Sequence, residues 1–353
     1  MTIYYLYYLF VAIVAIISSR VCLNPNRRQR VMCSLYFVGL FLILACRHPS
    51  MGIDLHYGDY YGYLGRYSYI GDLSWAEAFT QPVNNYERGY ILFNKMLSCI
   101  STDPQMLIAS CAFFSLLPVM YMIRRLSDAP HLSIYIYMGL PVFMLLFSGL
   151  RQVLALGVCC LALTFIYDRK PWHFILTVML ASTFHSTATV FLIAYPVYRI
   201  RISREMRVLT IAAFPVVYVF RYQLFVILSK LIKENAVPDD NGAFTLFLVF
   251  CLIYVFGIFY TDGEKEENGM LNIFFLACCC QALGGVYSIV IRIGYYFMYP
   301  MMLFLPRMIR RNTSYRDSVI LTLVIGACFV AFGLDSIKTT SWALAYPYRF
   351  FWK

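Results

Sequence analysis

Two polar side chains that could take part in a reaction, those of Arg151 and His185, stand in otherwise apolar sequence. Charged and titratable groups are costly inside a bilayer, so each one in an apolar segment is a candidate for function. A guanidinium matches phosphate oxygens with two parallel hydrogen bonds, and an imidazole can accept or donate a proton near neutral pH. For each residue alone there is a simpler interpretation: an arginine whose head reaches the membrane surface, or a buried histidine that only satisfies hydrogen bonds.

Two further arginines stand at predicted outer ends of membrane segments. Arg47 follows the second apolar run, and Arg292 precedes the sequence IGYYFMYP. Each could likewise extend its head group to the membrane surface. Three guanidinium groups at one face would, however, suit a lipid that carries a pyrophosphate.

Polar and aromatic residues are concentrated in two blocks outside the apolar segments, RHPSMGIDLHYGDYYGY from Arg47 and NNYERGY from Asn84. Glycines allow tight turns there, while tyrosine rings can stack on sugars and carboxylates can bind sugar hydroxyls. One interpretation is therefore a sugar-binding surface. The other is a solvated loop with an interfacial helix and a belt of tyrosines.

The composition indicates a membrane protein. Of the 353 residues, 61% are hydrophobic and 13% are charged, about half of the charged share of a soluble protein. Many apolar runs approach the ~20 residues that cross a bilayer. The net charge of +11 is explained by arginines in short loops, as the positive-inside bias predicts, and does not indicate nucleic acid. The 12 cysteines have no metal-ligand spacing, so we expect no metal and no cofactor.

The apolar runs predict an all-α fold, a polytopic transmembrane helical bundle of about 11 or 12 membrane segments. We expect one integral membrane domain over residues 1–353. Residues 47–103 form a long extracytoplasmic loop, and within it Tyr90–Ile100 has the pattern of a short amphipathic helix, too short to span.

The apolar stretch 172–198 is best explained as a broken or re-entrant helix pair. As one span it would carry the basic run from Arg199 to Arg207 to the outer face, against the positive-inside bias. Two short helices that fold back at Phe184-His185-Ser186 would leave that run inside. Irregular backbone at membrane depth is tolerated only where it lines a cavity or is buried in protein, so we expect His185 to face a hydrated cavity.

Four short motifs follow one another along the chain: R-x-x-x-x-G-x-D, Y-E-x-G-Y, S-G-L-R-Q-x-L-A and A-S-x-F-H-S. In this order they resemble the EpsG-like group of Wzy-type polysaccharide polymerases. The similarity runs from about residue 40 to 205, with a weaker echo at Arg292-Ile293 and in the tail at Tyr348–Phe350. The matching residues are Arg47, Gly52, Asp54, Tyr86, Glu87, Gly89, Ser148, Arg151, Gln152, Ala155, Ala181, Phe184, His185 and Ser186.

The resemblance implies a metal-independent glycosyltransferase with a GT-C-like architecture in the bacterial cytoplasmic membrane, its site facing the outside. Such an enzyme transfers a growing glycan from undecaprenyl pyrophosphate to the non-reducing end of another lipid-linked repeat unit. It would act with a flippase and a chain-length regulator, and without nucleic acid.

The resemblance also suggests roles for individual residues. The candidate bases are His185, Asp54 and Glu87, in that order. Arg151 and Arg292 would bind the pyrophosphate, with Arg47 assisting. The candidates for binding or positioning sugars are Gln152, Tyr57, Arg88 and Tyr86.

Two other functions fit parts of the sequence. A membrane-bound O-acyltransferase also uses an intramembrane histidine, but it gives no reason for three outer-face arginines. A flippase for lipid-linked oligosaccharides would use the arginines to line a path, and would be expected to contain internal repeats, which the sequence does not show.

Overall fold

The computed structural model describes residues 1–52, 62–232, 244–261 and 265–352, and these are helical almost throughout, without a strand. Six helices in this part of the chain are long and apolar enough to cross a membrane, or up to eight if each of two bent pairs forms one span. The prediction of an all-α, polytopic membrane protein is confirmed. The count is lower than the 11 or 12 segments expected, and two of the apolar segments are shorter helices, Pro171–Phe184 and Phe244–Tyr260.

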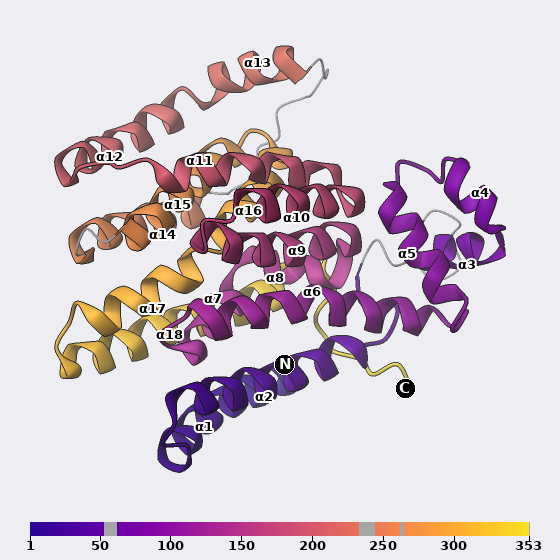
Figure 1. Ribbon diagram of the computed structural model, residues 1–353, viewed down its shortest axis with the longest axis horizontal. Coiled ribbons are helices and arrows are strands. Elements are labelled where there is room, and N and C mark those ends of the chain that lie inside the picture. Colours follow the sequence, from indigo (N-terminus) through magenta and orange to yellow (C-terminus); the bar gives the residue numbers. More distant parts are fainter. Residues whose placement is uncertain (53–61, 233–243, 262–264, 353) are drawn as a thin grey trace. The chain divides into compact units, whose positions relative to one another are not determined.

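The chain divides into two compact units, the first formed by Met1–Thr189 with Ile320–Lys353 and the second by Val190–Val319. The helices of the first unit (Figure 1) are α1 (Thr2–Val21), α2 (Pro25–Ala45), α3 (Tyr63–Asp72), α4 (Trp75–Thr80), α5 (Arg88–Ser98), α6 (Pro104–Leu126), α7 (Pro130–Gly139), α8 (Pro141–Ser148), α9 (Leu150–Tyr167) and α10 (Pro171–Phe184).

Two elements run across the boundary between the units, the 3₁₀ helix η2 (Ser186–Ile193) and α18 (Tyr315–Thr339). The second unit contains α11 (Ala194–Arg199), α12 (Arg204–Val219), α13 (Arg221–Ile232), α14 (Phe244–Tyr260), α15 (Lys265–Gly284), α16 (Ser288–Met298) and α17 (Met301–Arg311).

Helix α9 lies at the centre of the first unit and packs against both α6 and α10. Its contact with α6 depends on Gly157, because a Cβ atom there would lie 2.7 Å from the carbonyl oxygen of Ser115. Small residues let membrane helices approach until their backbones touch, and the packing energy of such contacts holds the helices together. The close approach fixes the position of α9, and with it that of Arg151 in its first turn.

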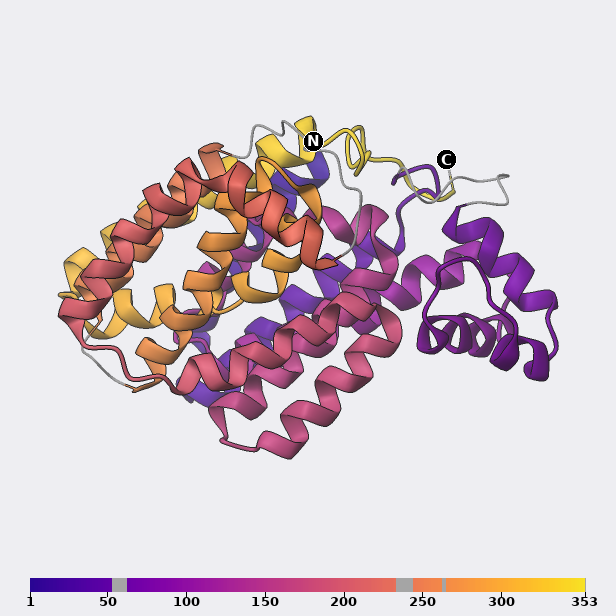
Figure 2. The ribbon, with the colours of Figure 1, turned by 90° about the horizontal axis from the view of Figure 1, so that it is seen from above.

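The short amphipathic helix is confirmed as α5. Together with α3 and α4 it forms a small group at one end of the long helices of its unit, as Figures 1 and 2 show. The apolar face of α5 packs through Tyr90, Phe93 and Leu97 against α3 and against residues of α6 and α9. Burying these side chains anchors a helix that is too short to be stable alone.

The helix in the stretch 172–198 is interrupted at the residues that the sequence indicated. Helix α10 ends at Phe184, His185 has extended backbone angles (φ −155°, ψ 116°), and η2 begins at Ser186. The break in the stretch 172–198 is therefore confirmed. The fold-back of its second half stays a prediction.

The C-terminal tail lies along the segment that follows α2. The hydroxyl of Tyr348 donates a hydrogen bond of 2.7 Å to the carbonyl oxygen of Ile43, and the backbone N–H of His48 donates to Arg349. Between them, Arg47 and Phe350 form an isolated antiparallel bridge. The backbone N–H of Phe351 also donates to the carbonyl oxygen of Cys46, so backbone groups of the tail fix the residues on both sides of Arg47.

We expect Gly157→Ala to destabilise the protein, because the added methyl group would clash with the backbone of Ser115. Unlike a side chain, this backbone cannot avoid the clash by changing rotamer. A cost of 1–3 kcal/mol is typical of overpacking, and thermal unfolding in detergent would show it as a lower Tm. Gly326→Ala is the matched control: its Cβ would meet side chains rather than backbone, the nearest being a ring atom of Tyr135 at 3.3 Å. Equal Tm values for the two variants would contradict this account of the α6–α9 contact.

Candidate active site

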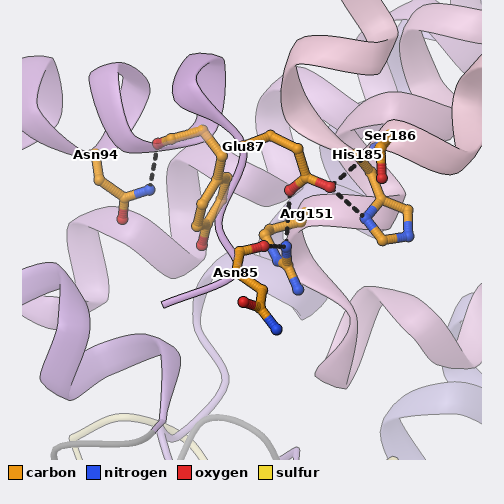
Figure 3. A network of polar contacts seen from close by, with 7 residues as sticks. Asn85, Glu87, Asn94, Arg151, His185 and Ser186 are labelled. Carbon is orange, nitrogen blue, oxygen red and sulfur yellow. Dashed lines mark hydrogen bonds and ion pairs between the residues drawn. The ribbon is translucent and has the colours of Figure 1, made fainter. Parts of the chain in front are cut away.

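Three elements bring Glu87, Arg151 and His185 together (Figure 3). Glu87 is the N-cap residue of α5, Arg151 lies in the first turn of α9, and His185 occupies the break after α10. The carboxylate of Glu87 accepts a 2.7 Å hydrogen bond from Nη1 of Arg151 and lies 3.3 Å from Nδ1 of His185. Glu87 therefore bridges the two polar residues that stand out in the apolar sequence.

Glu87 also stabilises the helix break. Its Oε1 atom accepts a 2.8 Å hydrogen bond from the backbone N–H of Ser186, the first residue of η2. The first N–H groups of a helix have no partner within it and need an external acceptor. A carboxylate from the other side of the site supplies one here, so the break and the site depend on the same residue.

A glycine brings α5 close enough to α10 for these contacts. A Cβ atom at Gly89 would lie 2.2 Å from the hydroxyl oxygen of Thr183 and 2.8 Å from its carbonyl oxygen. No other residue fits without a shift of the backbone. The preceding loop is held by Arg88, whose guanidinium donates hydrogen bonds to the carbonyl oxygens of Thr80 and Gln81.

The guanidinium of Arg151 is held by three consecutive residues. Its Nη1 atom donates to the carbonyl oxygen of Asn85 at 2.8 Å and to the carboxylate of Glu87, as Figure 3 shows, and its Cζ lies 4.5 Å from the ring centroid of Tyr86. Its Nε atom is buried and has no hydrogen-bond partner among the described residues. Tyr63 also forms a side-chain hydrogen bond with Arg151, so the group is held by several residues with its Nε donor still unsatisfied.

The electrostatics of the site favour a charged Glu87. Burial raises the pKa of this carboxyl, but His185, the N–H of Ser186 and the positive charge of Arg151 outweigh burial and lower the pKa to about 2. The positive end of a helix dipole also disfavours a cation in the first turn of α9, so Arg151 needs this anion. At neutral pH Glu87 is therefore an anion that accepts from Arg151 and lies 3.3 Å from Nδ1 of His185.

The contact with Glu87 determines which nitrogen of His185 carries the proton in the neutral ring. A carboxylate can only accept, so the proton belongs on Nδ1, which faces it. Nε2 then presents a lone pair away from Glu87. With its side chain 17% exposed, His185 is enclosed by protein but open to a small reactant.

The other two predicted arginines have different surroundings. Arg47 is 1% exposed, and its Cζ lies 4.9 Å from the ring centroid of Phe147. Its burial lowers its pKa to about 10, and its Nε and Nη1 atoms lack hydrogen-bond partners among the described residues. Arg292 is exposed on α16 in the second unit.

The remaining candidates have varied surroundings. Gln152 is buried in the first turn of α9, Arg88 binds backbone carbonyls, and Tyr86 contacts Arg151. Asp54 and Tyr57 lie outside the described residues. No group of histidine, cysteine and acidic residues in the described ranges could hold a metal ion.

Sequence reasoning missed three parts of the site: the carbonyl of Asn85, the N–H of Ser186 and the ring of Tyr63, which stacks on Tyr86. The two backbone groups carry no signal in the sequence. Tyr63 ends the first external block, and its position within a tyrosine-rich stretch was the one available hint.

Comparison with known proteins adds one finding. The sequence model described as the EpsG family matches residues 30–350, which is nearly the whole chain. No curated protein and no solved structure matches it.

The lowered pKa of Glu87 makes a prediction about stability and pH. The stabilisation from its ionised form is complete above the ordinary carboxyl pKa and is lost as pH falls through the folded value of about 2. We expect Glu87→Gln to lower the free energy of unfolding by an amount on the order of 2 kcal/mol. The resulting fall in Tm should be the same at pH 7 and at pH 5. The difference from the wild type should shrink below about pH 4.

Glu77→Gln is the control for this comparison, since Glu77 is a half-buried carboxylate in the capping box of α4 and forms no ion pair among those of the described residues. Its effect on Tm should be smaller at neutral pH. A Tm difference between the wild type and Glu87→Gln that stays constant from pH 7 down to about pH 2 would mean that folding does not lower the pKa of Glu87.

Proposed function

The chain belongs to the EpsG family of multi-pass membrane proteins, which implies polysaccharide biosynthesis, and we propose that it is a Wzy-type polysaccharide polymerase. The donor is a glycan on undecaprenyl pyrophosphate, and the acceptor is the non-reducing end of another lipid-linked repeat unit. The reaction takes place at the outer face of the bacterial cytoplasmic membrane. A flippase would supply the repeat units, and a chain-length regulator would act on the product.

The proposed transfer exchanges one bond for another at the anomeric carbon of the donor. The acceptor hydroxyl oxygen forms a bond to this carbon while the bond from the carbon to the phosphate oxygen breaks. The hydroxyl proton passes to a base on the protein, and the lipid diphosphate leaves with the electron pair. The site must therefore provide a base and stabilise negative charge on the leaving group.

The contact between Glu87 and His185 is the observation that supports this function most directly. A histidine whose Nδ1 faces a carboxylate can accept a proton at Nε2, and the carboxylate then stabilises the imidazolium. We therefore assign the base to His185. Glu87, with a pKa of about 2, is too weak a base and orients His185 instead; Asp54 remains the alternative base.

Arg151 is suited to the leaving group. Glu87 and Asn85 accept from its Nη1 atom and Tyr63 also bonds the group, while its Nε donor is unsatisfied and belongs to the edge that can bind a phosphate with two hydrogen bonds. A fixed cation of this kind stabilises developing charge without having to reorganise. In this proposal Arg292 and Arg47 are the second and third cations for the pyrophosphate, and Gln152, Tyr57 and Arg88 bind or position sugars.

Polymer formation by purified protein tests the function. The protein in detergent would receive undecaprenyl-pyrophosphate-linked repeat units and EDTA, and the products would be separated on a gel. We expect a ladder from the wild type, its rate lowered at least about 100-fold in His185→Ala and in Arg151→Ala. His173→Ala, an exposed histidine on α10, and Arg30→Ala, an exposed arginine on α2, are the matched controls and should keep the ladder.

The other outcomes decide between the alternatives. A folded wild type that binds the lipid but yields no ladder would favour a flippase. Transfer of an acyl group from acyl-CoA would favour the O-acyltransferase. A ladder that survives His185→Ala but not Arg151→Ala would keep the reaction and move the base to Asp54.

A further inference from the structure

Three tyrosines form a connected cluster beside Arg151. The rings of Tyr63 and Tyr86 are stacked, with centroids 5.7 Å apart, and Tyr90 meets both edge-on at 5.9 and 5.4 Å. Tyr90 is fully buried in the core that joins α3, α5 and α6. Stacked and edge-to-face pairs each add to the energy of burial, so the cluster is a rigid support rather than a set of independent side chains.

The guanidinium of Arg151 rests on this support. Its Cζ is 4.5 Å from the Tyr86 centroid, while Asn85 and Glu87 accept hydrogen bonds from Nη1. Tyr63 adds a side-chain hydrogen bond to the same guanidinium. These hydrogen bonds hold the rim of the planar group, and the face of Tyr86 holds its plane, since the cation is attracted to the centre of the ring.

The cluster also explains why Tyr86 is poorly placed to hold a sugar. Tyr63 stacks on its ring, Arg151 approaches the ring to 4.5 Å, and the Cζ of Arg66 lies 5.7 Å from the same centroid. Stacking on a sugar needs an open aromatic face. A ring with three such neighbours is better suited to holding a cation than to receiving a sugar.

We propose that Tyr86, supported by Tyr63 and Tyr90, is a positioning residue for Arg151. It holds the guanidinium so that the edge containing Nε faces a diphosphate, and it makes no contact with the sugar. This assignment rests on the proposed function for its substrate, a lipid diphosphate, but the geometry of the cluster does not depend on that function.

Binding of inorganic pyrophosphate tests this role without turnover. We expect Tyr86→Leu to weaken pyrophosphate binding about 5- to 30-fold, the factor that corresponds to 1–2 kcal/mol of cation–π attraction. Tyr86→Phe and Tyr86→Trp keep an aromatic face and should bind within about twofold of the wild type. Phe79→Leu, which removes an exposed ring of α4, is the control and should have no effect.

A double-mutant cycle separates positioning from a structural role. If Tyr86 acts through Arg151, then Tyr86→Leu should have no further effect on pyrophosphate binding in an Arg151→Gln background. Equal losses in both backgrounds would overturn the proposal. So would a loss in Tyr86→Phe as large as in Tyr86→Leu, because the hydroxyl would then be the important group.

The two proposals can fail separately. If the wild type binds pyrophosphate with the expected coupling but makes no polymer, the polymerase function fails and the positioning role stands. If the wild type makes polymer but binds no pyrophosphate, or Tyr86→Leu binds it as the wild type does, the positioning role fails alone. Thermal unfolding of each variant, with Tyr86→Phe as the folded reference, identifies any loss that comes from misfolding.

Discussion

The site depends on one partly buried carboxylate, that of Glu87. Removing such a group from water is costly, and the cost is offset only when its oxygens are bonded and its charge is balanced. Arg151, His185 and the N–H of Ser186 provide these contacts from two other elements. The same carboxylate stabilises the break after α10, compensates the cation at the start of α9 and orients the imidazole. Its loss would therefore disturb local structure and chemistry together.

Two close backbone approaches allow this carboxylate to reach its partners. Gly157 lets α9 lie against α6, and Gly89 lets the first turn of α5 lie against the last turn of α10. A Cβ atom at either position would push the helices apart, and a displacement of about 1 Å is enough to disturb the geometry of such a site.

Arg47 shows a different solution to a buried charge. No described carboxylate forms an ion pair with it; it lies against Phe147, and the C-terminal tail pairs with its backbone. Burial lowers its pKa, whereas in Glu87 hydrogen bonds and a neighbouring cation outweigh burial. Two arginines of similar appearance in the sequence thus have unlike surroundings, one bound to an acid and the other enclosed by aromatic and backbone groups.

The sequence by itself determined the helical membrane fold, the short helix α5 and the break at His185, and it singled out Arg151 and His185 as candidates. These follow from local rules: apolar length, amphipathic period and the cost of a polar group among apolar neighbours. Only the tertiary structure decided that Glu87 is their common partner, because the bonded groups of Arg151 and Ser186 lie 64 and 99 residues further along the chain. The contact of Arg151 with Asn85 and Tyr86, and that of Arg47 with the tail, were equally beyond the sequence. Such pairs are set by helix packing, which brings distant segments together and leaves no periodic signal in either one.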